Sequence, residues 1–193
     1  MEQDFTLEYF KEHRDFVYAE VVKFLTNFKA TNANILEIGP SESLQLKELI
    51  PECNYFCSDI VSRNDIDFQM DITLPDQISI TEKFDIVICA EVMEHVVDPF
   101  AAVQTISNLL KPGGAIIATT PLNLRIHGPI PDCWRFTEFG LRVLFRNFEI
   151  IEINKLNTPG RPLFPLHYSL LAIKPLIVKE LNPQDLTFVK VQP

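Results

Sequence analysis

The segment from Ile35 to Ser43, with the sequence ILEIGPSES, most constrains what this chain can fold into. An apolar run ends in an acid and a glycine, and the small polar residues that follow can open a helix. Asp59 comes twenty residues after Gly39, at the end of a second apolar stretch, YFCSD. Parallel sheets that hold a nucleotide-like ligand at the carboxyl ends of their strands show this order along the sequence: a strand, a glycine turn, a helix, a second strand and an acid.

The rest of the chain continues this alternation. Hydrophobic periodicity predicts helices at 5–28, 41–50, 98–110 and 137–145, and strands at 35–38, 55–58, 67–70, 84–90, 115–120, 148–156 and 166–173. Residues 84–90, FDIVICA, form a nearly uninterrupted apolar run, which is typical of a central parallel strand covered on both faces. The sequence KPGG predicts a turn before residue 115. The last two strands have no helix-length segment between them, so we expect them to pair antiparallel.

These elements predict an α/β fold. We expect a Rossmann-like, doubly wound, mostly parallel sheet with an antiparallel final strand, helices on both faces and an added N-terminal helix. The length of 193 residues predicts a single domain over residues 1–193. Within it, the N-terminal helix falls in 1–30, the core in 35–173 and a tail in 174–193. The N-terminal helix either covers the ligand or packs on the sheet edge, and the sequence leaves both open.

Charge and composition exclude several classes of protein. A net charge of −9 argues against a broad phosphate-binding surface, so a nucleic-acid partner is not expected. The four cysteines form no CxxC pair and are better explained as buried thiols of a reduced protein than as disulfides or a zinc site. The first residues, MEQDFTLEYFKEHRD, are too charged for a signal peptide, and no apolar run approaches the ~18 residues of a membrane helix. We therefore expect a cytoplasmic protein without a membrane partner.

Four blocks, in order, resemble a known family. They are ILEIGPSES, CSDI with MDITLP, FDIVICAEVMEHVVDP, and LLKPGGAIIATTP, and the last two at their mutual spacing are the specific part. The chain resembles the class I S-adenosylmethionine-dependent methyltransferases, in the branch with a compact methyltransferase domain. The resemblance covers roughly residues 35–148. A nicotinamide oxidoreductase would instead need the fuller fingerprint GxGxxG, which this sequence lacks.

The resemblance implies S-adenosylmethionine as cofactor and gives roles to residues at the strand ends. Gly39 would let the backbone approach the ligand, Glu37 would reach its ammonium group, Asp59 would bind the ribose hydroxyls and Asp71 the adenine amino group. The complete cofactor set that it implies is Glu37, Gly39, Pro40, Ser41, Asp59, Ile60, Asp71, Ile72 and Ala90. The family usually has further glycines where this chain has Pro40, Ser41 and Ser43. The alternative is a purely structural turn, with Asp59 and Asp71 as strand-end caps.

The segment AEVMEHVVDP concentrates ionisable side chains. Glu91, Glu94 and His95 are spaced i, i+3 and i+4, so in a helix they would share one face. In one interpretation His95 is a general base that removes a proton from an acceptor hydroxyl. In a second, the two carboxylates and the imidazole bind a divalent metal. In a third, Glu94 and His95 only pack and hydrogen-bond beside the ligand.

The ExxEH pattern resembles that of ubiquinone-pathway O-methyltransferases and small-RNA 2′-O-methyltransferases, where it supports metal-dependent chemistry. Those families add a histidine from the loop after the fifth strand, and here Asp132 or His127 is in position to complete the site. The resemblance thus implies a catalytic set of His95, Glu91 and His127. It also implies a Mg²⁺ or Mn²⁺ site made of Glu91, Glu94, His95 and Asp132.

The loop HGPIPDCWRFTEFG follows the fifth strand, where the transferred methyl group should emerge. Trp134 and Phe136 could clamp a planar or sugar-like acceptor, and Arg135 could bind an anionic group. Alternatively, the two aromatic rings pack the loop onto the sheet and Arg135 pairs with an internal carboxylate. The sequence does not separate these interpretations.

These inferences lead to one expected function and one alternative. We expect an S-adenosylmethionine-dependent methyltransferase that transfers a methyl group to a small-molecule or glycan-precursor acceptor, at oxygen, in a chain that can form a homodimer. The alternative is a non-catalytic protein of the same fold that acts as a binding or partner subunit, which the altered glycine turn motivates. Cofactor binding without product formation would leave that alternative open.

Overall fold

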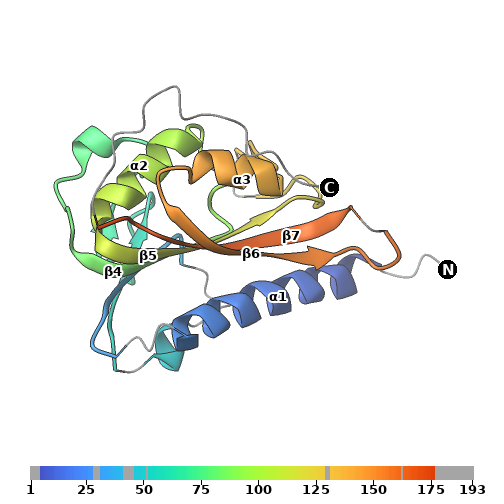
Figure 1. The fold of residues 1–193 in the computed structure, drawn as a ribbon, viewed down its shortest axis with the longest axis horizontal. Helices are drawn as coiled ribbons and strands as arrows, with labels where there is room; N and C mark the ends of the chain where they lie inside the picture. The colour runs from blue at the N-terminus through green and yellow to red at the C-terminus, as the bar shows by residue number, and fades with distance from the viewer. Residues whose placement is uncertain are drawn as a thin grey trace.

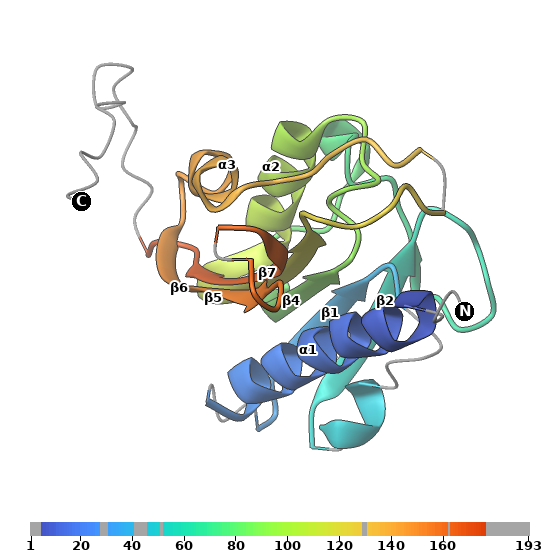
Figure 2. The same cartoon turned by 90° about the vertical axis from the view of Figure 1, so that its right-hand side faces the viewer.

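The computed structural model describes residues 5–27, 31–40, 46–50, 52–128, 131–161 and 163–176, with side chains from residue 11 onward. A seven-stranded sheet forms its centre (Figures 1 and 2), in the order β3-β2-β1-β4-β5-β7-β6. The strands are β1 (Asn34–Ile38), β2 (Asn54–Asp59), β3 (Phe68–Gln69), β4 (Phe84–Ala90), β5 (Leu110–Pro121), β6 (Glu149–Asn157) and β7 (Pro165–Ile173). Pairing is parallel from β3 through β5, and β7 is antiparallel to both β5 and β6. The expected mostly parallel sheet with an antiparallel final strand is confirmed.

Helices cover both faces of the sheet, as expected. α1 (Phe5–Asn27) lies along one face, while α2 (Pro99–Leu109) and α3 (Glu138–Leu144) lie on the other (Figure 1). The buried side chains of α1 recur at helical spacing as Val17, Val21 and Phe24, and they pack against the β1 and β4 residues of that face. No helix in the described ranges is both long enough and apolar enough to cross a bilayer.

The ends of the helices follow their local sequence. Asp98 is the N-cap of α2, and its side chain accepts hydrogen bonds from the backbone N–H groups of Phe100 and Ala101. Pro99 occupies the first helical position, where its missing N–H is not needed. Thr137 caps α3 in the same way by accepting from the N–H of Gly140. Both predicted helix starts are confirmed.

Two elements differ from the expectation. In the predicted helix 41–50, the described part contains only a 3₁₀ helix, η1 (Leu46–Leu49), and residues 41–45 lie outside the described ranges. The KPGG segment belongs to β5 rather than to a turn before it, although Gly113 keeps a left-handed φ of 78°. A second 3₁₀ helix, η2 (Pro75–Gln77), precedes β4.

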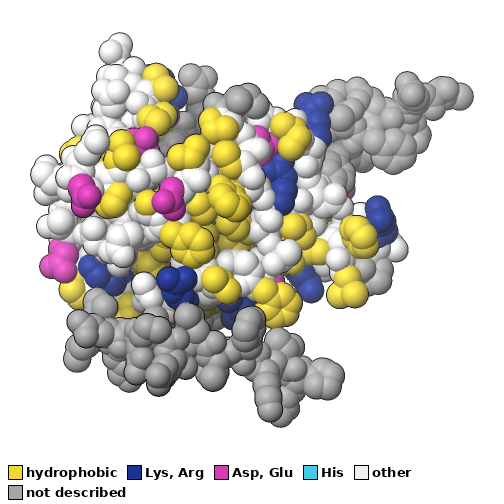
Figure 3. All heavy atoms as spheres, turned by 90° about the horizontal axis from the view of Figure 1, so that it is seen from above, with side chains coloured by type: hydrophobic (Ala, Val, Ile, Leu, Met, Phe, Trp, Pro, Cys, Tyr) yellow, Lys and Arg dark blue, Asp and Glu magenta, His cyan; other side chains and the backbone are white. Residues whose placement is uncertain are grey.

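Exposed apolar side chains gather on the face formed by α2 and α3. Figure 3 shows this face, where hydrophobic side chains form a band and charged side chains are scattered around it. The exposed large hydrophobic residues of these helices are Phe100, Phe139 and Val143, and the guanidinium of Arg146 lies 5.5 Å from the Phe100 ring centre. None of the site residues predicted from the sequence lies on these two helices.

The strand order marks where a ligand should bind. From β1 the chain builds outward to β2 and β3 on one side, and then to β4 and β5 on the other. The crevice at the carboxyl ends of strands that flank such a reversal is the usual binding place in open α/β sheets. The carboxyl ends of β1, β2 and β4 therefore position the candidate site.

Candidate functional site

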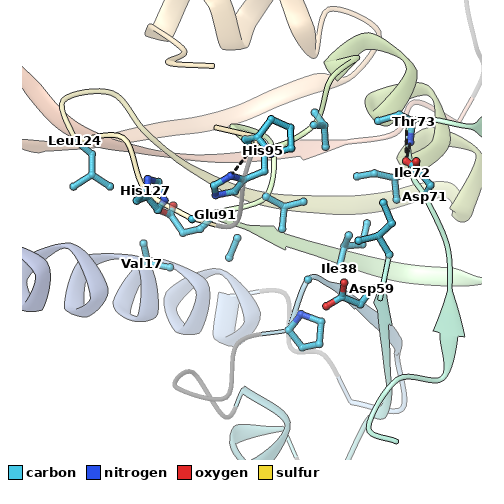
Figure 4. Close-up of a pocket in the computed structure, with 18 of the residues that line it drawn as sticks. Val17, Ile38, Asp59, Asp71, Ile72, Thr73, Glu91, His95, Leu124 and His127 are labelled. Carbon is cyan, nitrogen blue, oxygen red and sulfur yellow. Dashed lines mark hydrogen bonds between the residues drawn. The ribbon is translucent and has the colours of Figure 1, made fainter. Parts of the chain in front are cut away.

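A cavity of about 820 Å³ opens at these strand ends (Figure 4). It is bounded by the carboxyl ends of β1, β2 and β4, by one side of α1, and by the loop that follows β5. Most of the predicted cofactor residues line it, namely Gly39, Pro40, Asp59, Ile60, Asp71, Ile72 and Ala90. Ser41 lies outside the described residues.

Glu37 is not among the described residues that line the cavity. Successive strand residues point to opposite faces, so Glu37 shares the α1 face of the sheet with Ile35. There its buried carboxylate accepts a hydrogen bond of 2.9 Å from the Tyr55 hydroxyl. Burial raises the pKa of the Glu37 carboxyl, and the Tyr55 hydrogen bond opposes that shift. The structure thus gives Glu37 a partner inside the protein instead of the predicted contact with the cofactor ammonium.

Gly39 makes the turn that ends β1. Its φ of 66° lies in the left-handed region, and its N–H donates to the carbonyl of Ser58 at 2.8 Å. A Cβ at this position would lie 2.7 Å from Cγ2 of Val92. Backbone conformation and close packing therefore both require glycine here, which keeps the turn open toward the cavity.

Asp59 and Asp71 stand at the ends of β2 and β3, on the same side of the cavity (Figure 4). Asp59 accepts a hydrogen bond from the N–H of Val61 and lies 3.3 Å from the Arg63 guanidinium. Asp71 accepts from the N–H and the hydroxyl of Thr73 through one carboxylate oxygen. Both carboxylates are held locally and remain on the cavity wall, where each can accept further hydrogen bonds from a ligand.

The segment from Glu91 to Val97 is a turn and not a helix, so the expected shared face of Glu91, Glu94 and His95 is wrong. Glu91 has a left-handed φ of 58°, and its carboxylate is not part of the group that Glu94 and His95 form with His127. Its Oε1 accepts from the hydroxyl of Thr119 at 2.9 Å and lies 2.6 Å from Nε2 of His167. Glu91 lines the cavity but does not belong to a cluster with Glu94 and His95.

A different trio does converge. Glu94, His95 and His127 each offer one ligand atom, and these atoms lie within 4.8 Å of one another. The Glu94 side chain is fully buried, and neither of its oxygens has a hydrogen-bond partner among the described residues. Burial and, secondarily, the charge of Glu91 raise the pKa of the Glu94 carboxyl well above its usual range. A buried carboxylate without donors, facing two imidazoles, is the arrangement expected of a site completed by a bound group.

The two histidines of this trio are oriented by neighbours. Nδ1 of His95 lies 3.0 Å from the carbonyl oxygen of Pro131, which can only accept, so Nδ1 carries the proton and Nε2 faces Glu94 at 3.7 Å. Nε2 of His127 lies 3.9 Å from Glu94, and its Nδ1 lies 3.2 Å from the Asp132 carboxylate. Nδ1 of His127 makes no hydrogen bond among the described residues. His95 is therefore held through Nδ1, and both rings present Nε2 to the buried carboxylate.

Asp132 supports the site rather than joining the trio. Its carboxylate accepts from the Arg135 guanidinium through both oxygens and from the N–H of His127. The Arg135 hydrogen bonds hold the pKa of Asp132 well below its usual range. The metal role expected of Asp132 is not what the geometry favours, because its oxygens are already engaged.

The aromatic residues of the same loop pack internally. The indole N–H of Trp134 donates to the carbonyl of Val96 at 2.8 Å, and its ring stacks on Phe136 with centres 6.0 Å apart. The N–H groups of Cys133 and Trp134 both donate to the carbonyl of Glu94. Within the described residues, Trp134, Arg135 and Phe136 do not line the cavity. The geometry favours the packing interpretation, and the loop fixes the turn that carries Glu94.

Sequence reasoning missed two histidines of the cavity, His13 and His167. They come from α1 and β7, and their Nδ1 atoms lie 2.6 Å apart. All four histidines of the chain line this one cavity. The available signal was the position of His13, which falls four residues before Val17 on the buried face of α1.

Comparison with known proteins shows which family the chain belongs to. A sequence model described as a methyltransferase domain matches residues 10–154. A ubiquinone biosynthesis O-methyltransferase of Glaesserella parasuis is 50% identical over 40 residues, which are 21% of this chain and 17% of that protein. The matched segment is therefore a small part of that relative.

Solved structures show the same fold at low sequence identity. A 1,6-didemethyltoxoflavin-N1-methyltransferase of Burkholderia thailandensis, bound to its substrate and S-adenosylhomocysteine, has a TM-score of 0.63 at 16% identity over 82% of this chain and 78% of that one. The N-methyltransferase NodS of Bradyrhizobium japonicum has a TM-score of 0.61 at 18% identity, over 88% and 98% of the two chains. Because the family match spans most of its length, this chain belongs to the methyltransferase domain family, with the Rossmann-like class I fold.

Proposed function

We propose that this protein transfers a methyl group from S-adenosylmethionine to an oxygen of a small-molecule or glycan-precursor acceptor. The cofactor half of the proposal is supported by membership of the methyltransferase domain family and by the cavity at the strand ends. The Burkholderia relative of the same fold binds S-adenosylhomocysteine. In this proposal Asp59 binds the ribose hydroxyls, Asp71 binds the adenine amino group, and the turn at Gly39 accommodates the amino-acid end.

The observation that carries the choice of oxygen is the convergence of Glu94, His95 and His127. His95 and His127 line the end of the cavity away from Asp59 and Asp71 (Figure 4). A hydroxyl is a weak nucleophile, so methyl transfer to oxygen needs a group that polarises or deprotonates it. An amine acceptor that is neutral needs no such assistance. The short match to an O-methyltransferase points in the same direction.

Most of the rate acceleration of methyl transfer can come from positioning the acceptor oxygen against the methyl group. The methyl group on a sulfonium is already activated, and displacement proceeds in line once the acceptor oxygen is held about 3–3.5 Å from the methyl carbon. α1 and the loop after β5 form the wall at this end of the cavity. This chain's main contribution is to align cofactor and acceptor in one cavity.

A divalent cation fits the trio. One carboxylate and two imidazoles suit a first-row metal such as Mn²⁺, and they converge within 4.8 Å. The unsatisfied oxygens of Glu94 would gain the partner they lack. The Pro131 carbonyl already orients the His95 ring, and the Asp132 carboxylate lies 3.2 Å from Nδ1 of His127. Glu94, His95 and His127 would hold such an ion. When bound, it would supply positive charge that makes the acceptor hydroxyl more acidic.

Isothermal titration with S-adenosylmethionine and S-adenosylhomocysteine tests the cofactor half, and we expect micromolar binding. A methylation screen then tests the acceptor half. It pairs hydroxyl acceptors, such as catechol, 3,4-dihydroxybenzoate and hexose derivatives, with amine analogues of the same size, each with Mn²⁺ or with a chelator. Methylation of hydroxyl acceptors alone supports the proposal, whereas preference for the amines contradicts it. Cofactor binding with no product across the screen favours the non-catalytic alternative.

A further inference from the structure

A second series of polar side chains, which runs from His13 through His167 to Glu91, reaches the cavity beside the trio and is separate from it. Nδ1 of His13 contacts Nδ1 of His167 at 2.6 Å, and Nε2 of His167 contacts Oε1 of Glu91 at 2.6 Å. Oε1 also accepts from the hydroxyl of Thr119. The chain therefore joins α1, β7, the end of β4 and β5 through three consecutive contacts.

The two ends of the chain differ in burial. His13 is 5% exposed and His167 is 1% exposed, whereas the Glu91 side chain is 29% exposed and lines the cavity. Oε1 of Glu91 accepts both anchoring hydrogen bonds, and Oε2 makes none within the described ranges. One oxygen of the carboxylate is thus fixed to the protein, and the other is left for whatever occupies the cavity.

The backbone is strained to achieve this. Glu91 is one of the few described non-glycine residues with a left-handed φ. Such a conformation is energetically costly and persists only where the surroundings hold it. The side-chain contacts with His167 and the Thr119 hydroxyl hold Glu91 here, together with the hydrogen bond from its backbone N–H to the Thr119 carbonyl.

We propose that Glu91 accepts the proton that the acceptor hydroxyl loses, and that His167 and His13 are positioning residues that hold its carboxylate in place. This inference rests on the proposed function. In the step, the hydroxyl oxygen forms a bond to the methyl carbon while the methyl–sulfur bond breaks and leaves its electron pair on a neutral thioether. The O–H bond breaks, and its proton bonds to Oε2 of Glu91. The atoms and charges balance without a further reactant.

The position of Glu91 suits this role. Figure 4 shows Glu91 at the same end of the cavity as His95 and His127, away from Asp59 and Asp71. The proton acceptor therefore lies at the same end of the cavity as two of the groups proposed to hold the cation, without being one of them.

The surroundings determine the protonation state of His13. Burial, followed by the charge of His167, lowers the pKa of His13 to about 4, so the His13 ring is neutral near neutral pH. Nε2 of His167 must carry a proton to donate to the charged Glu91. The other charged and titratable groups that line the cavity are Lys11, Arg14, Asp59, Arg63, Asp71, His95 and His127.

Ring-nitrogen NMR of protein labelled with ¹⁵N-histidine, bound to S-adenosylhomocysteine, tests the chain without an acceptor. Four histidines give four assignable spin systems. We expect His167 to be protonated at Nε2, and Glu91→Gln to shift the signals of both His167 and His13. An unprotonated Nε2 on His167, or signals of His167 and His13 that do not respond to Glu91→Gln, would overturn the proposal.

Kinetics on an acceptor from the screen tests the role. His167→Leu should lower kcat at least tenfold without changing the KM for S-adenosylmethionine more than twofold. His167→Gln should recover most of that loss, because its amide N–H can donate to Glu91. Ser169→Ala is the matched control: Ser169 lies two residues along β7 and donates to Glu20 of α1, so it docks the same helix without touching Glu91. Its kcat should stay within twofold.

Equal losses of kcat in His167→Leu, His167→Gln and Ser169→Ala would show that these side chains only dock α1 on β7, and would overturn the proposal. If the wild-type protein methylates nothing, the proposed function fails instead, and the NMR measurement still decides whether His167 donates to Glu91. The two failures are therefore distinguishable.

Discussion

Gly39 and Val92 are in direct contact across the mouth of the cavity: a Cβ on Gly39 would lie 2.7 Å from Cγ2 of Val92. Gly39 ends β1, and Val92 follows the strained residue Glu91 after β4. The turn on the cofactor side and the turn on the acceptor side are thus packed against each other. A substitution in either turn is therefore expected to alter the conformation of both.

Gly39→Ala should weaken cofactor binding and destabilise the protein. Alanine at a φ of 66° costs about 1–2 kcal/mol, and its methyl group must displace Val92. Calorimetric titration with S-adenosylhomocysteine and thermal unfolding measure the two effects. Gly128→Ala is the matched control, because Gly128 lines the same cavity and a Cβ there meets no atom within 4 Å. Equal behaviour of the two variants would contradict the packing argument.

Asp59→Ala should weaken binding of S-adenosylhomocysteine by roughly 1–3 kcal/mol, because the ribose hydroxyls would lose their acceptor. Titration calorimetry gives the affinity directly. Asp65→Ala serves as control, since Asp65 also pairs with Arg63 but does not line the cavity. An unchanged affinity in Asp59→Ala would remove Asp59 from the cofactor site.

Mn²⁺ should stabilise the wild-type protein if Glu94, His95 and His127 hold a cation. Binding at a hundredfold excess over the dissociation constant adds about 2.7 kcal/mol to the free energy of unfolding, which thermal unfolding detects as a rise in Tm. Glu94→Gln should abolish the rise, while Asp65→Asn, which changes an exposed acid, should keep it. A rise of the same size in all three proteins would indicate binding elsewhere.

His13 should make the fold sensitive to acid. Its pKa falls from 6.5 to about 4 on folding, so the unfolded chain takes up the proton first as pH falls. Stability is therefore lost between about pH 6.5 and 4, by up to about 3 kcal/mol. The difference in unfolding free energy between wild type and His13→Asn, measured by urea denaturation across this range, should shrink as pH falls. Parallel curves for the two proteins would show that His13 is not responsible.

Glu37 offers a separate test of the contact that the sequence predicts with the cofactor. Because its carboxylate is bonded to Tyr55 and does not line the described cavity, Glu37→Gln should leave the affinity for S-adenosylhomocysteine within about threefold. Burial raises the pKa of this carboxyl, so its stabilising contribution is present below about pH 4.5 and is lost as pH rises through the raised pKa. A large loss of affinity in Glu37→Gln would restore the cofactor role expected from the sequence.

The sequence by itself determined the sheet and most of the cavity wall that we propose binds the cofactor. An apolar run that ends in glycine or acid is readable because strand ends in a parallel sheet meet at one edge. This places Gly39, Asp59, Asp71 and Ala90 together without knowledge of any long-range contact, and the structure brings all four to one cavity. The starts of α2 and α3 at Asp98 and Thr137 were predictable for a different reason, since capping depends only on neighbouring residues.

Only the tertiary structure decided how the acceptor end is built. The spacing of Glu91, Glu94 and His95 suggests one helical face, but the left-handed φ of Glu91 sends its carboxylate to His167 instead. His127 replaces Asp132 in the trio because Arg135 occupies the Asp132 carboxylate. His13 and His167, 154 residues apart, meet because α1 docks on β7. Sequence periodicity reports which face of an element is buried, but the partner that a buried polar group finds depends on the packing of distant elements.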